Sequence, residues 1–230
     1  MQMELNLIKP RLATSVNVNI RALVKAVGIR PNYTEYNYDT KSIKYINEKN
    51  AFGDGIALNK NAILLYMYLH FLNVNANAHA VLDIYEASKY LSISERTVIH
   101  NMKILNHKGY LRFCEGDLSG TYHIFIDYYA DNNLPASRGG SGFITLTRNI
   151  FDKLRTLRTI NALRFAIRGL MDQFPGKQNV GTSTGCDLSK LKTVFPSYTQ
   201  VKDIYKILSN STIKEMFDIA IAASGKYIKF

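Results

Sequence analysis

Two helix start signals that lie close together constrain the fold of this chain more than any other feature. Asp83 and Glu86 form a capping box, in which each residue satisfies a free backbone N–H of the first turn, and they predict a helix that ends at Leu91. Ser94 is a second N-cap candidate, and it predicts another helix over residues 95–108. Only a tight turn fits between the two helices.

A predicted hairpin follows this helix pair. Gly109 is suited to end the second helix, because glycine readily adopts the left-handed conformation of a C-cap. Residues 110–113 and 121–127 then predict two short strands, and the polar turn 115–120 joins them. Residues 61–71 before the pair are apolar on nearly every face, which predicts a helix buried between two partners. The expected order is helix, helix, tight turn, helix and β-hairpin.

The predicted helix over residues 95–108 has two contrasting faces. Val98, Met102 and Leu105 share one face and are expected to pack against the preceding helices. The opposite face gathers cations and hydrogen-bond donors of the kind that a helix in the major groove uses: Arg reads guanine, Asn reads adenine, and Lys or His neutralises phosphate. The predicted DNA contacts of this region are Ser94, Arg96, Thr97, His100, Asn101, Lys103, His107 and Arg112.

The residues around this helix resemble winged helix-turn-helix DNA-binding domains. The resemblance rests on the small residue Ala87, on Ser94-Glu95-Arg96-Thr97-Val98 at the start of the helix, and on Lys108-Gly109-Tyr110-Leu111 after it. It covers about 70 residues, and it implies that the third helix enters the major groove while the hairpin touches the DNA backbone. One departure is that Glu115 and Asp117 in the turn repel phosphate, so we expect Arg112 at the base of the hairpin to make the contact.

Charge supports a polyanionic partner. The chain has 230 residues and a net charge of +11. Residues 1–137 hold 14 basic and 12 acidic side chains, whereas the remaining residues hold 15 basic and 6 acidic ones. Most of the excess positive charge therefore lies in the C-terminal part, and cations near phosphates strengthen binding by releasing counterions.

The C-terminal part resembles a repeat of the first unit. Residues 160–171 predict a long helix, and Ser197 with Gln200 predicts a capped helix over 198–208. Its outward side chains, Thr199, Lys202 and Lys206, are further DNA-contact candidates. Together with Gly142-Phe143-Ile144-Thr145-Leu146 before a helix, this order is similar to replication and regulatory proteins of bacterial plasmids and phages, some of which join two winged helices.

These patterns predict an α+β, mainly α-helical protein with two winged helices in tandem. The expected divisions are an N-terminal arm at 1–55, a winged helix-turn-helix domain at 56–130, a linker at 131–141 and a second winged-helix-like basic domain at 142–230. Residues 20–29 predict a short helix inside the arm, and residues 30–55 predict a loop or extended segment.

Enzymatic chemistry has no visible signature. The phosphate-binding motif with Gly-Lys-Ser/Thr is absent, the five histidines lack metal-site spacing, and Cys114 and Cys186 cannot form a zinc site unaided. We therefore expect neither catalytic residues nor a metal or other cofactor. The apolar run 62–72 is too short to span a bilayer and no signal peptide is visible, so a cytoplasmic protein without membrane contact is expected.

The sequence leaves the use of DNA binding open. A sequence-specific transcriptional regulator of double-stranded DNA leads, a plasmid or phage replication initiator that marks an origin is the alternative, and a winged-helix protein-interaction module is a third reading. A homodimer is expected for two reasons: a helix-turn-helix usually reads two half-sites, and helix 61–71 has more apolar surface than one small domain covers.

Overall fold

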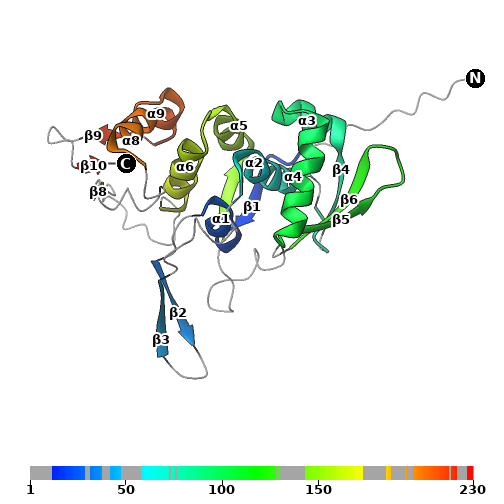
Figure 1. Ribbon diagram of the computed structural model, residues 1–230, viewed down its shortest axis with the longest axis horizontal. Coiled ribbons are helices and arrows are strands. Elements are labelled where there is room, and N and C mark those ends of the chain that lie inside the picture. The colour runs from blue at the N-terminus through cyan, green and yellow to red at the C-terminus, as the bar shows by residue number, and fades with distance from the viewer. Residues whose placement is uncertain are drawn as a thin grey trace, which may run out of the picture. The chain divides into compact units, whose positions relative to one another are not determined.

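The computed structural model has an α+β fold (Figure 1). Its sheets are small and antiparallel, and the described residues contain four of them. The structure describes residues 12–28, 32–37, 42–47, 58–72, 74–75, 77–127, 129, 143–172, 185–187, 195, 199–217, 219–221 and 227–229.

The chain forms two compact units, and each is discontinuous in sequence. The first draws on residues 1–19 and 64–151, and the second on residues 20–63 and 152–230. These limits differ from the sequential divisions expected at residues 56, 131 and 142. The predicted linker, residues 131–141, lies outside the described residues.

A three-stranded sheet organises the first unit. Its strands are β4 (His79–Asp83), β5 (Leu111–Glu115) and β6 (Thr121–Ile126), in the order β4-β6-β5. One face of the sheet is apolar and buried, with Leu82, Leu111 and Ile124 fully inaccessible. The hairpin β5–β6 confirms the predicted pair of strands. Strand β4 was not expected, because its short apolar stretch shows no clear alternation.

Helix α2 (Lys60–Phe71) confirms the predicted buried helix. Residues 62–72 are all buried, including Tyr66 and His70. Because this chain covers the helix itself, no second copy is needed to cover it. That reason for expecting a homodimer is therefore wrong.

Burial of His70 makes stability depend on pH. Its Nδ1–H donates to the Tyr66 carbonyl oxygen at 2.9 Å, and its Nε2 has no hydrogen-bond partner among the described residues. Burial lowers the pKa of His70 from 6.5 to about 4. The unfolded chain therefore takes up this proton at a higher pH than the folded chain does. Stability from this group is complete above pH 6.5, and it is lost as the pH falls toward 4.

We expect acidification from about pH 7 to about pH 4 to remove up to about 3 kcal/mol of unfolding free energy through His70. Denaturant unfolding of the wild-type chain and of His70→Phe across this range measures the effect. The variant lacks the titrating group, so its stability should fall less steeply, while other acidic groups affect both proteins alike. Parallel pH profiles would contradict the assignment.

The N-terminal segment is integrated into the fold. Strand β1 (Ser15–Asn19) pairs antiparallel with β7 (Phe143–Thr147), so this part of residues 1–55 is no free arm. Residues 32–37 (β2) and 42–47 (β3) pair as an antiparallel hairpin where a loop or extended segment was expected.

The second unit contains α1, α6, α8, α9, the β2–β3 hairpin and a small sheet, and the boundary between the units falls within α5, after Phe151. Helices α1 (Ile20–Val27) and α6 (Ile160–Asp172) confirm the helices predicted at 20–29 and 160–171. Helix α5 is Arg148–Thr156, α8 is Val201–Leu208 and α9 is Ser211–Phe217. Strands β8 (Gly185–Asp187), β9 (Ala220–Ile221) and β10 (Tyr227–Lys229) form a sheet in the order β8-β10-β9.

Candidate nucleic-acid interface

The connection between α3 (Ile84–Leu91) and α4 (Glu95–His107) is a short, hydrogen-bonded turn. Asp83 caps α3, since its carboxylate accepts from the Glu86 N–H at 3.0 Å. Ser92 has a φ of +55°, the left-handed conformation that ends a helix, and the Ile93 N–H donates to the Ser88 carbonyl. The turn predicted from Ser92-Ile93-Ser94 is confirmed.

Both ends of α4 are capped as the sequence predicted. At its start, Ser94 Oγ accepts from the Thr97 N–H at 3.2 Å. At its end, Gly109 has a φ of +73°, and the N–H groups of Gly109 and Tyr110 donate to the carbonyls of Asn106 and Leu105. This pair of bonds is a Schellman motif, and it directs the chain into β5.

The two faces of α4 are the predicted ones. Val98, Met102 and Leu105 are fully inaccessible, and α4 packs beside the β4-β6-β5 sheet (Figure 1). The exposed strip consists of Arg96, His100, Lys103 and His107. Glu95 is also exposed in the first turn. It lies about 100° around the helix from Arg96, so the strip itself contains no acidic side chain.

Asn101 is a correction to the predicted site. It is 2% exposed, and its Nδ2 donates to the Thr97 carbonyl oxygen at 2.8 Å. At about 100° per residue it lies only about 60° from Val98, so it falls at the edge of the buried face. A buried amide that is bonded to its own helix cannot present itself to a base edge.

Asn101 should therefore affect stability and leave base preference unchanged. We expect Asn101→Ala to lower the free energy of unfolding by about 1–2 kcal/mol, because a buried hydrogen bond is lost. Asn106→Ala is the matched control: Asn106 is exposed on the same helix, so the change should stay within about 0.5 kcal/mol. Denaturant unfolding compares the three proteins. Unchanged stability with relaxed base preference in Asn101→Ala would restore Asn101 to the contact surface.

Ser94 and Thr97 have a structural task at the start of α4. Their hydroxyl oxygens are 2.8 Å apart, and Ser94 also caps the helix. Ser94 is exposed and Thr97 is half-buried. The contacts of Ser94 and Thr97 with DNA stay predictions. Each contact would use a hydroxyl that is already hydrogen-bonded to the other.

The β5–β6 turn is hydrogen-bonded and acidic. Gly116 N–H donates to the Thr121 carbonyl at 2.9 Å, and Thr121 Oγ1 donates to the Leu118 carbonyl at 2.7 Å. Glu115 and Asp117 are exposed on this turn, and Leu118 is 54% exposed between them and Thr121. The turn therefore presents negative charge and an apolar side chain, which does not suit contact with phosphate.

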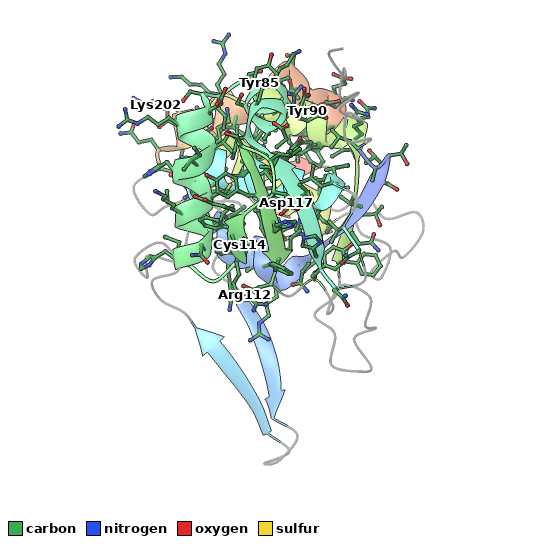
Figure 2. The ribbon with its side chains drawn as sticks, turned by 90° about the vertical axis from the view of Figure 1, so that its right-hand side faces the viewer. Tyr85, Tyr90, Arg112, Cys114, Asp117 and Lys202 are labelled. Atoms are coloured by element: carbon green, nitrogen blue, oxygen red, sulfur yellow. The ribbon has the colours of Figure 1, made fainter. Side chains whose placement is uncertain are left out.

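Arg112 lies on the same hairpin as Asp117 (Figure 2). Its Nε is 3.5 Å from Asp127 Oδ1, and its side chain is 75% exposed. An exposed ion pair of this kind contributes little to stability and leaves the guanidinium accessible. The phosphate contact of Arg112 stays a prediction, and Asp127 lies beside the guanidinium.

Two cations that were not predicted as contacts lie beside tyrosines of α3, namely Lys89 on α3 and Arg148 at the start of α5. Tyr85 is 58% exposed, and Lys89 Nζ lies 5.9 Å from the centre of its ring. Arg148 lies 5.7 Å from the ring centre of Tyr90. Both tyrosines belong to α3 (Figure 2). The spacing of four residues between Tyr85 and Lys89 was the available signal for the first pair.

The candidate residues of the second unit are only partly as predicted. Lys202 and Lys206 are exposed on α8, with Lys206 Nζ 3.9 Å from Asp203 Oδ1. The helix begins at Val201, its N-cap is Gln200, and Gln200 makes no side-chain cap bond. Thr199 therefore precedes the helix, and its hydroxyl is buried, so it is no outward contact. Ser197 lies outside the described residues.

Arg164 belongs to the core of the second unit. It is 8% exposed, its Nε donates to the Val27 carbonyl at 2.8 Å, and its Nη1 donates to Asn161 Oδ1 at 2.8 Å. It is one of the 15 basic residues that give the C-terminal part its excess positive charge. In the fold it joins α6 to the end of α1.

No group of three or more His, Cys, Asp or Glu in the described part of the chain could hold a metal ion. His79 and His123 do meet on the sheet, with Nε2 of the first 2.9 Å from Nδ1 of the second. No helix among the residues that the structure describes is both long and apolar enough to cross a membrane.

Comparison with known proteins gives one distant structural likeness. No protein-family model matches the chain, and no curated protein matches it either. A solved structure described as a crystal structure of Pi initiator protein in complex with iteron DNA is similar, with a TM-score of 0.49 and 10% sequence identity over 97% of each chain. A likeness of this degree does not establish a family or a function.

Proposed function

We propose that residues 58–127 form a winged helix-turn-helix domain that binds double-stranded DNA sequence-specifically, with α4 in the major groove. The observation that carries this proposal is a capped helix held against the sheet by one face, while Arg96, His100, Lys103 and His107 line the other. A helix in the major groove needs such a face, because base edges and phosphates both accept hydrogen bonds from it.

The order of elements supports the same proposal. The helices and strands follow in the order α2, β4, α3, α4, β5 and β6, and the first and last strands of the set are neighbours in the sheet. Winged helix-turn-helix domains have this order, with the hairpin as the wing. The acidic turn does not suit the usual contact of a wing tip with phosphate. On this proposal the base contacts come from α4.

The second unit is proposed as another winged helix. Its sheet order β8-β10-β9 matches β4-β6-β5, with α6 before the first strand and α8 and α9 between β8 and β9. On this proposal the second unit supplies phosphate contacts through Lys202 and Lys206. Phosphate contacts add affinity and orientation without reading bases.

Lys202→Ala/Lys206→Ala tests the second unit in the full chain. A cut between the two halves is unsuitable, because it separates β1 from β7. We expect affinity for duplex DNA to fall several-fold at all sequences alike, and the slope of log affinity against log salt to decrease by about 2. Fluorescence anisotropy at several salt concentrations measures both. An unchanged slope would mean that the two lysines do not contact phosphate.

The biological use is proposed as transcriptional regulation, with origin marking by a replication initiator as the alternative. Both uses need the same DNA-binding surface and differ in where the site lies. Genome-wide selection of bound fragments by the full chain separates them: enrichment at promoters supports regulation, and enrichment at a replication origin supports initiation. No enrichment of any duplex would favour the third reading, a protein-interaction module.

We also propose that the domain acts by binding alone, with no catalytic residue, metal or cofactor.

A homodimer is proposed from half-site geometry, since two copies of a helix-turn-helix read half-sites about one helical turn apart. Sedimentation of the chain with and without its selected duplex tests the dimer, and one chain per duplex in both cases would contradict it.

A further inference from the structure

Most of the polar groups on the exposed strip of α4 are hydrogen-bond donors. Arg96 and Lys103 have no acceptor, and the imidazoles of His100 and His107 have at most one each. Asn101 was the predicted amide that could donate and accept at one base edge, and it is buried on its own helix. The strip is therefore matched to bases that present acceptors.

Guanine meets this requirement best. In the major groove it presents two acceptors, N7 and O6, whereas thymine presents one acceptor beside a methyl group, and adenine and cytosine each present an amino donor that needs an acceptor on the protein. We propose that α4 selects duplex sites that carry guanine, with Arg96 as its principal reader. This inference rests on the proposed function and names the class of DNA that the same surface recognises.

The spacing of the strip limits where the guanines lie. A helix rises about 1.5 Å per residue, so Arg96 and Lys103 lie about 10 Å apart along α4. Successive bases of one strand are about 3.4 Å apart, so this length covers about three base steps. The guanines are therefore expected within about four consecutive base pairs. The acidic turn with Glu115 and Asp117 adds no reader beside them.

A random duplex library, selected by the full chain, tests the inference first. The expected result is enrichment of guanine at two or more positions within about four base pairs. In the best selected duplex, each guanine is then replaced by 7-deazaguanine, which lacks the N7 acceptor and still pairs with cytosine. We expect about tenfold weaker binding at the position that Arg96 reads.

Three variants connect the readout to α4. Arg96→Ala should bind the selected duplex more weakly, and its binding should no longer respond to 7-deazaguanine at one position. Lys89→Ala removes an equal charge from an exposed position of α3 and should leave guanine preference unchanged. Asn101→Ala should also leave it unchanged. Circular dichroism confirms that each variant is folded before binding is measured.

Two outcomes overturn the inference, and they are distinguishable. If the chain binds duplex DNA with steep salt dependence but the selected sites lack guanine or ignore 7-deazaguanine, the guanine inference is wrong and the proposed function stands. If the chain binds no duplex even at low salt, the proposed function is wrong as well.

Discussion

Binding of the full chain to its selected duplex is expected to weaken about a thousandfold when the salt concentration rises from about 50 to about 200 mM. The expectation follows from the net charge of +11 and from the exposed cations on α4 and α8. Each cation that neutralises a phosphate releases counterions, and about six such contacts give a loss of this size. Fluorescence anisotropy titrations across this salt range measure it.

A control separates electrostatic binding from a general effect of salt on the fold. Thermal unfolding of the chain without DNA should change little over the same range. A flat affinity would mean that phosphates contribute little, and it would favour a protein-interaction module over a DNA-binding protein.

Reversal of charge on the strip of α4 is expected to have the other large effect. Arg96→Glu/Lys103→Glu should reduce affinity by at least about a hundredfold at about 100 mM salt, because two attractive contacts become repulsive. Both side chains are exposed, so the free energy of unfolding should change by less than about 0.5 kcal/mol. Anisotropy titration and denaturant unfolding of the same preparation measure the two quantities.

A charge-matched comparison shows whether position matters. Lys103→Glu and Lys89→Glu change the net charge equally, and both lysines are exposed. Only Lys103 lies on the proposed contact strip, so its reversal should cost at least tenfold more affinity. Equal losses would show that binding responds to total charge, and α4 would lose its assigned role.

Local signals made the helix pair readable from sequence. Asp83, Ser94 and Gly109 act on backbone groups a few residues away, so their roles are encoded nearby and the structure confirms them. The apolar stripe of Val98, Met102 and Leu105 was equally direct. These features also placed the exposed strip of the candidate site.

Long-range and marginal features were not readable. The pairing of β1 with β7 joins segments far apart in the chain, and nothing in Ser15–Asn19 specifies its partner. Asn101 is polar, yet its angle brings it to the edge of the buried face. Asn210 caps α9, since its Oδ1 accepts from the Ile213 N–H at 3.2 Å, and this helix start was not predicted from the sequence.

The central claim is that the exposed strip of α4, and not the wing tip, meets the DNA. Site-specific crosslinking tests it most directly, with a photoreactive amino acid placed at Lys103 in one chain and at Asp117 in another. Both positions are exposed and lie in the same unit. We predict crosslinks from position 103 to bases of the selected duplex, and none from position 117. Crosslinks from position 117 alone would contradict the account.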